Sequence, residues 1–120
     1  RTAGVLLDKF FKDSWLHGRY DGQWRGSERL ITTGCAQLVI CWAWLHRIND
    51  EERYAEGVRR MTDLLITLQR TNLAGPAEAH GALSGSFPFW GRYEAFAFPN
   101  WATKYLIDAL LCAEGRLPRY

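Results

Sequence analysis

Residues 33–48 carry apolar side chains on almost every side of the helix that their spacing predicts. The apolar set comprises Cys35, Ala36, Leu38, Val39, Ile40, Cys41, Trp42, Ala43, Trp44 and Leu45. A surface helix shows one apolar stripe, whereas a helix that is apolar all round is buried on most sides. This segment therefore needs other helices around it, and it predicts an all-α unit. We expect Thr32 or Thr33 to cap its start.

Three further segments, residues 3–17, 51–70 and 101–113, are predicted to be helices. In the first, apolar residues recur at the helical spacings i, i+3, i+4 and i+7: Ala3, Leu6, Leu7, Phe10, Phe11 and Trp15. The second has an equally clear stripe: Tyr54, Val58, Met61, Leu65 and Leu68.

Glycine and polar residues predict where these helices begin and end. Gly18 and Gly115 are expected to end the first and last helices, since glycine tolerates the left-handed conformation found there. Asp50 is expected to cap the helix of residues 51–70. Pro99 and Asn100 are expected to open the last helix, close to the entry position that proline favours.

The chain has the order helix, loop, helix, twice, with residues 3–48 and 51–114 as the two repeats of one unit spanning residues 1–120. Ala36, Ala43 and Leu45 in the first repeat recur at the same spacing in the second, as Ala102, Ala109 and Leu111. A single helical pair cannot bury its own apolar face, so such pairs stack. We expect both connecting loops to emerge at the same end of the stack.

Composition excludes several classes of function. A net charge of +2 is too small to favour binding to nucleic acid or to an anionic membrane. The sequence contains no apolar run of about 18 residues, the length that a membrane-spanning helix needs. The three cysteines lack a CxxC spacing, which favours a reduced, cytoplasmic compartment and three small buried side chains. The histidines are scattered, so we expect no metal. No cofactor motif is present.

Two stretches resemble the α/α-toroid superfamily, which includes terpenoid cyclases, protein prenyltransferases and six-hairpin glycoside-active enzymes. They are TTGCAQLVICWAWLHRINDEERYAEGVRRMTDLLITLQ, residues 32–69, and GALSGSFPFWGRYEAFAFPNWATKYLIDALL, residues 81–111. The second is similar to a C-terminal repeat of bacterial toroid proteins linked to polysaccharide metabolism. The resemblance implies inner and outer helices around a central cavity, with substrate at one mouth.

Two helical hairpins are fewer than a closed ring requires. We therefore expect this chain to be a piece of a larger ring, completed by the rest of a longer chain or by a homo-oligomer. The sequence lacks the DxDD acid motif of terpene-protonating cyclases and the D-x-C zinc pair of protein prenyltransferases. A terpenoid cyclase-like fragment is accordingly the third interpretation.

Trp90, Arg92, Tyr93 and Glu94 form the densest group of aromatic and charged side chains. An aromatic face stacks on the apolar face of a sugar ring, while arginine and carboxylate groups hydrogen-bond its hydroxyls. The alternative is that the aromatic rings pack the loop onto the helices while the charges face water. The theme recurs in the first loop, in Trp24, Arg25, Glu28 and Arg29.

The start of the last helix supplies further candidates for the mouth. Trp101 is expected to line the cavity, and Asn100 either caps the helix, which is the expectation, or points into the mouth. Lys104 and Asp108 are four residues apart and form an exposed or an inward pair. If Asp108 is inward, Asp108 and Glu94 are the candidate acid/base carboxylates.

The sequence thus supports a carbohydrate-related toroid segment that binds a sugar or another small molecule. The main alternative is a non-enzymatic helical scaffold or oligomerisation module, because interfaces also favour tryptophan, tyrosine and arginine. Whether the chain catalyses a reaction is left open by the sequence.

Overall fold

Four helices make up most of the structure, a computed structural model that describes residues 1–71 and 75–117. The all-α prediction is therefore confirmed at the level of class. The helices are α1 (Thr2–Asp13), α2 (Thr32–Asn49), α3 (Glu52–Arg70) and α4 (Asn100–Ala113). The short elements are β1 (Arg19–Tyr20), β2 (Gly26–Ser27), β3 (Leu30–Ile31), β4 (Ser86–Phe87) and the 3-10 helix η2 (Ala77–Ala79).

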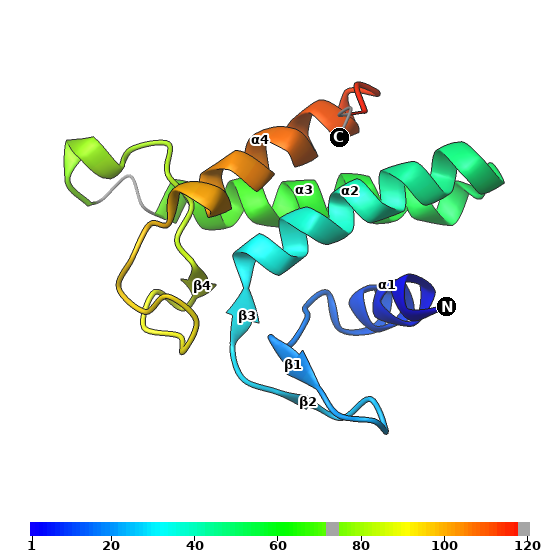
Figure 1. Ribbon diagram of the computed structural model, residues 1–120, viewed down its shortest axis with the longest axis horizontal. Coiled ribbons are helices and arrows are strands. Elements are labelled where there is room, and N and C mark those ends of the chain that lie inside the picture. The colour runs from blue at the N-terminus through cyan, green and yellow to red at the C-terminus, as the bar shows by residue number, and fades with distance from the viewer. Residues whose placement is uncertain (72–74, 118–120) are drawn as a thin grey trace.

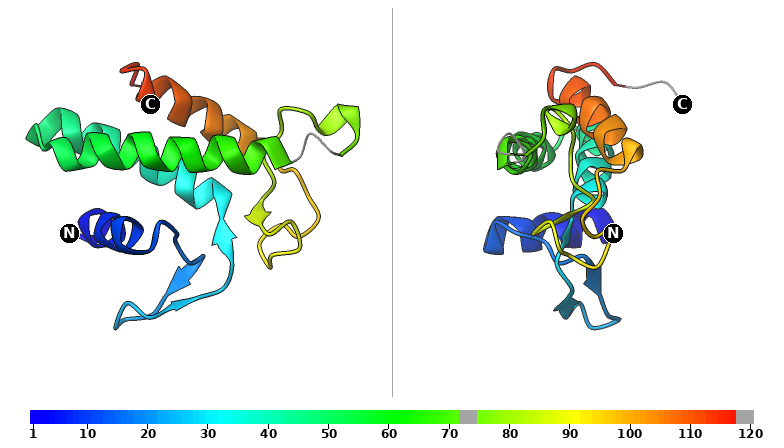
Figure 2. Two further views of the ribbon diagram at one scale, coloured as in Figure 1. Left: turned by 180° about the vertical axis from the view of Figure 1, so that it is seen from behind. Right: turned by 90° about the vertical axis from the view of Figure 1, so that its left-hand side faces the viewer.

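Helix α2 is the centre of the packing and contacts both α3 and α4. Figures 1 and 2 show α4 on one side of the α2–α3 pair and α1 on the other. Helices α2 and α4 run in one direction and α3 runs in the opposite one, whereas α1 lies across the other three helices. The loop after α1 and the loop after α3 come together where β3 and β4 lie side by side.

Most of α2 is buried, as its composition predicts. Trp42 and Val39 are completely inaccessible to solvent, and both belong to one core that all four helices share. One side of the helix differs from the prediction, because Cys41, Trp44 and Ile48 are exposed. Three neighbouring helices leave that side uncovered, so the expectation of three buried cysteines is wrong for Cys41.

The predicted stripe of α3 is confirmed, because all five of its residues are buried.

The predicted helix ends are only partly confirmed. Ser14 adopts the left-handed conformation and ends α1 before Gly18. Asp50 likewise ends α2 and does not cap α3, whose start carries Glu51 without a side-chain hydrogen bond. Gly115, with φ +79, follows the end of α4 as expected.

The start of α2 shows why the predicted threonine cap is wrong. Ile31, at the end of β3, occupies the cap position, so Thr32 and Thr33 lie inside the helix. The hydroxyl of Thr32 donates instead to carbonyl groups of the loop before α4. Pairing of β3 with β4 holds this junction together, and no local sequence pattern predicts that pairing.

Gly57 allows α3 to approach α1 and α2 closely. A Cβ atom at this position would lie 3.2 Å from Trp42 Cε3 and closer still to Leu7 Cδ1, both in fully buried side chains. We expect Gly57→Ala to lower the free energy of unfolding by about 1 kcal/mol, because overpacking outweighs the gain in helix propensity. Gly4→Ala is the control in urea denaturation, since its Cβ would lie 3.5 Å from Tyr54 Oη. Equal effects of the two changes would contradict this packing.

The three cysteines are free thiols that differ in exposure. Burial raises the pKa of Cys35 to about 12, and burial followed by the Asp108 carboxylate raises the pKa of Cys112. Only the thiolate is nucleophilic, so iodoacetamide at pH 8 should modify exposed Cys41 at least about 100-fold faster than Cys35, and faster than Cys112 as well. Peptide mass mapping over time measures the rates. Equal labelling of Cys35 and Cys41 in folded protein would contradict the placement of α2.

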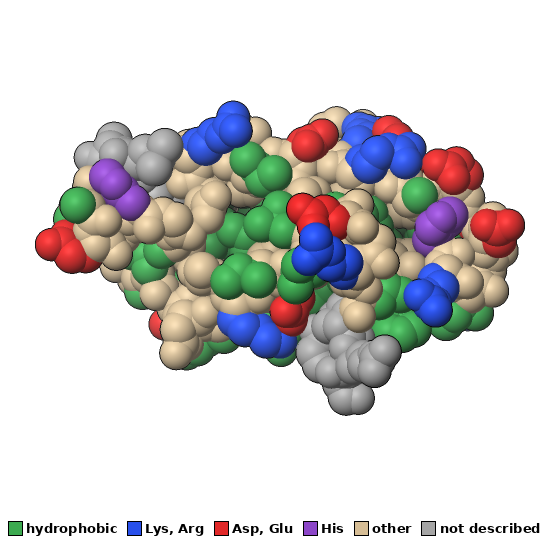
Figure 3. Space-filling model, turned by 90° about the horizontal axis from the view of Figure 1, so that it is seen from above, with side chains coloured by type: hydrophobic (Ala, Val, Ile, Leu, Met, Phe, Trp, Pro, Cys, Tyr) green, Lys and Arg blue, Asp and Glu red, His purple; other side chains and the backbone are tan. Residues whose placement is uncertain are grey.

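The surface has no strongly charged face in the view of Figure 3, where acidic, basic and hydrophobic side chains are interspersed. Within residues 1–71 and 75–117, no helix is both long and apolar enough to cross a membrane.

Candidate functional site

The two loops at one end of the molecule are joined through their backbones. Strand β3 of the first loop pairs with β4 of the second, with Leu30 opposite Phe87 and Ile31 opposite Ser86. The backbone N–H of Thr32 donates to the Gly85 carbonyl at 3.2 Å, and its hydroxyl donates to the same carbonyl at 3.1 Å and to that of Ser84. The two loops therefore lie together at this junction, while a common mouth of a helical ring stays a prediction.

The first loop is shaped by a tight β1–β2 hairpin around Asp21. Its carboxylate accepts backbone hydrogen bonds from Gln23 and Arg25, each at 2.9 Å, and pairs with Arg25 Nε at 2.7 Å. The backbone hydrogen bond from Arg25, followed by its side-chain bond, lowers the pKa of Asp21. The polar groups of Asp21 and Arg25 are therefore hydrogen-bonded to each other within the tip of the hairpin.

The second loop folds back on itself at Gly85. A Cβ atom there would lie 2.5 Å from Glu94 Cβ and 3.1 Å from the Tyr93 carbonyl oxygen, so only glycine fits. Gly85 N–H also donates to the Ala97 carbonyl at 3.2 Å. Phe89 stacks beside Phe98, with ring centroids 5.0 Å apart, and this aromatic packing supports the loop from within.

An open groove of about 630 Å³ lies between the two loops. We call it the inter-loop groove. Residues from both loops line it: His17, Ser27, Glu28, Arg29, Trp90, Gly91 and Arg92. Trp90 is 65% exposed, although large apolar residues are usually buried. A concave surface with an open aromatic face and several polar groups is typical of a ligand site.

Charges in the inter-loop groove are unequally paired. Glu28 lies 3.6 Å from Arg19 Nε, and its carbonyl oxygen lies 3.2 Å from His17 Nδ1. Among the described residues, Arg29 and Arg92 form no ion pair. Within the described part of the chain, neither guanidinium group is therefore directly paired with a carboxylate.

Backbone strain gathers in the same two loops. Apart from two residues at helix ends, the described non-glycine residues with positive φ are Trp24, Glu28, Glu94 and Phe96. Such conformations cost about 1–3 kcal/mol each and persist where the surrounding structure fixes them, often at functional sites. Glu28 combines this strain with a place in the groove.

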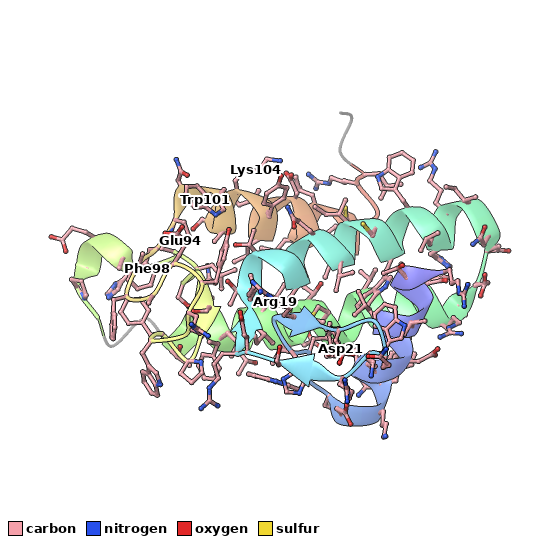
Figure 4. All side chains as sticks on the ribbon, turned by 60° about the horizontal axis from the view of Figure 1, so that its bottom comes forward. Arg19, Asp21, Glu94, Phe98, Trp101 and Lys104 are labelled. Atoms are coloured by element: carbon pink, nitrogen blue, oxygen red, sulfur yellow. The ribbon has the colours of Figure 1, made fainter. Side chains whose placement is uncertain are left out.

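The structure brings together some of the predicted site residues and separates others. Trp90 and Arg92 share the inter-loop groove. Trp24 and Arg25 lie at the β1–β2 hairpin, where Trp24 packs beside Tyr20 and Arg25 pairs with Asp21, and neither lines the groove. In Figure 4, Asp21 on this hairpin lies well apart from Glu94 and Trp101.

Tyr93 and Trp101 form a separate contact outside the groove. The indole N–H of Trp101 donates to the Tyr93 hydroxyl at 3.3 Å, which fastens the second loop to the first turn of α4. Asn100 begins α4 but makes no capping hydrogen bond, because Pro99 occupies the cap position. The expected capping role of Asn100 is therefore wrong, and Asn100 is exposed beside the loop.

The candidate carboxylates Glu94 and Asp108 are not among the residues that line the groove. Glu94 is exposed on the second loop, and Figure 4 shows it near the start of α4. Asp108 accepts from Lys104 Nζ at 2.6 Å along α4, as the spacing of the two residues predicts. An acid/base role for Glu94 and Asp108 stays a prediction.

Sequence reasoning missed His17 and Ser27 as groove residues and ranked Arg29 below Arg25. The sequence carries no local signal that could have found them. The segment around Ser27 to Arg29 faces the second loop only because β3 pairs with β4.

A second, more apolar hollow of about 480 Å³ adjoins the first and shares Trp90 with it. Its remaining lining comes mainly from the second loop, including Phe87, Pro88, Phe89 and Phe98. Trp90 therefore stands between a polar groove and an apolar one. Among the described residues, no three histidine, cysteine or acidic side chains gather to hold a metal ion.

Comparisons of the chain with known protein families, with curated proteins and with solved structures return no match.

Proposed function

We propose that the chain binds a carbohydrate in the inter-loop groove, as part of an α/α-toroid protein with a polysaccharide-related role. The observation that carries the proposal is the exposed indole of Trp90 within a concave surface that also holds Arg29, Arg92 and Glu28. An indole left open to water in a groove gains free energy when an apolar surface covers it. Sugar rings supply such a surface and surround it with hydroxyl groups.

Each side chain of the groove has a definable task in this proposal. Trp90 stacks on the face of a sugar ring, while Arg29 and Arg92 donate hydrogen bonds to its oxygen atoms. Glu28 accepts a hydrogen bond from a hydroxyl, because its pairing with Arg19 at 3.6 Å is too long for a strong hydrogen bond. Ser27 both donates and accepts.

The common direction of α2 and α4 supports the toroid part of the proposal, because the inner helices of such a ring run parallel to one another. Helix α1 lies across the other helices and does not add to this support. The two loops meet at the β3–β4 junction, where the proposal places the substrate mouth. Further hairpins would come from the rest of a longer chain or from sister subunits.

Replacement of Trp90 by alanine tests the proposal. We expect Trp90→Ala to weaken oligosaccharide binding at least about tenfold, equivalent to about 1.4 kcal/mol. Isothermal titration with a panel of neutral and acidic oligosaccharides measures the affinity. Trp44→Ala is the matched control, because Trp44 is 37% exposed on α2 and does not line the groove. No binding by the unmodified chain, or equal losses in both variants, would refute the proposal.

A non-enzymatic scaffold or oligomerisation module is the second candidate. It is favoured by Ile48 on α2 and Ile107 on α4, which are 72% and 52% exposed. Such side chains on the long helices suit contacts with further helices of the same kind. Sedimentation velocity distinguishes the candidates, since Ile48→Asp would lower the mass of an oligomer and leave sugar affinity unchanged.

A further inference from the structure

Arg29 and Arg92 reach the same groove from different loops. Arg29 immediately precedes β3, and Arg92 lies five residues after β4. Both side chains are exposed and line the inter-loop groove. Two like charges that share a groove repel each other unless a negative charge lies near them.

The groove holds one carboxylate, that of Glu28, against the two guanidinium groups of Arg29 and Arg92. Arg19 Nε also lies 3.6 Å from that carboxylate, so the groove keeps an excess of positive charge. The contrast with another hollow, at the far end of α2, is instructive. Arg47 and Arg59 both line that hollow, but Arg59 is paired with Glu56 at 2.5 Å and with Glu52 at 3.4 Å.

We propose that the saccharide bound in the inter-loop groove is acidic, and that its negative group lies between Arg29 and Arg92. This inference rests on the proposed sugar site and adds the chemical class of its ligand. Guanidinium groups bind carboxylate and phosphate oxygens through paired hydrogen bonds, which gives both affinity and orientation. Trp90, beside Arg92 in the groove, holds the ring that carries the acid.

The geometry divides recognition between two features. The stacked ring supplies an affinity that is independent of charge, and the arginine pair supplies a preference for the acid. A uronate unit and a phosphorylated sugar share this chemistry. The groove is open to solvent, so an oligosaccharide can extend beyond it.

The test compares oligogalacturonate with its fully methyl-esterified form of equal length, by isothermal titration of the 120-residue chain at pH 7. We expect the acid to bind at least about tenfold more tightly at low salt, and the difference to shrink as salt is added. Arg29→Gln and Arg92→Gln should each reduce affinity for the acid by a larger factor than affinity for the ester, because only the acid loses a charged partner. Arg47→Gln, at the far end of α2, is the matched control and should change neither.

The outcomes separate this inference from the proposed function. Equal affinity for acid and ester would overturn the acidic ligand and leave the sugar site standing, whereas no binding of either would overturn both. Competition by glucose 6-phosphate, but not by galacturonate, would support the inference with phosphate as the acid. If inorganic phosphate bound as tightly as the acidic sugars and Trp90→Ala did not weaken it, the groove would bind anions in general, and the inference of an acidic saccharide would be overturned. Circular dichroism melting verifies that each variant is folded.

Discussion

Replacing Trp42 with alanine should lower the free energy of unfolding by about 3–5 kcal/mol, the usual cost of removing a fully buried large aromatic side chain. Trp42 is inaccessible to solvent at the centre of α2. Its ring stacks with Phe10 of α1 at 6.0 Å between centroids, and its indole N–H donates to the Ala3 carbonyl at 3.0 Å. Loss of this side chain would leave a cavity between α1, α2 and α3 and free α1 from the core.

Urea denaturation followed by circular dichroism measures this effect. Trp44→Ala is the matched control, because it lies two residues away on the same helix and is partly exposed. We expect the control to change stability by no more than about 0.5 kcal/mol. Similar losses in the two variants would mean that α2 is rotated about its axis relative to the structure described.

The second large effect concerns the junction of the two loops. Thr32 is fully buried, and its hydroxyl donates to the carbonyls of Ser84 and Gly85. Thr32→Val keeps the shape of the side chain but removes the hydroxyl group. The Ser84 carbonyl then loses the hydrogen bond that this hydroxyl donates. We expect a loss of about 1–3 kcal/mol, the cost of an unsatisfied buried polar group.

Thr33→Val supplies the control for that experiment. The Thr33 hydroxyl is also buried but has no hydrogen-bond partner, so its removal should be neutral or stabilising. Thermal melting of the two variants and the unmodified chain gives the comparison. A larger loss for Thr33→Val than for Thr32→Val would contradict the contact that joins the two loops.

The sequence was most informative about the helices. Periodic spacing predicted the α3 stripe correctly, because one buried face needs nothing beyond local pattern and a neighbour to pack on. Helix ends were less predictable. Ser14 takes the left-handed conformation that was expected of Gly18, and Asp50 takes it instead of capping α3. Short polar residues adopt this conformation more readily than most others.

The site was only half predictable. Trp90 and Arg92 stand out in composition and do line the groove, whereas Trp24 and Arg25 look equally suitable in the sequence and lie elsewhere. The difference arises because Asp21 ties Arg25 into the hairpin tip. Arg29 reaches the groove through the register of β3 with β4, and each strand spans two residues, too few to leave a pattern.

The most direct test of the central claim is the ¹H–¹⁵N spectrum of the six tryptophan indoles during titration with oligogalacturonate and its methyl ester. The inter-loop groove predicts that the Trp90 resonance shifts with ligand concentration while those of buried Trp42 and distant Trp44 stay in place. Shifts confined to Trp44 or Trp101, with Trp90 unchanged at saturation, would contradict a sugar site between the two loops.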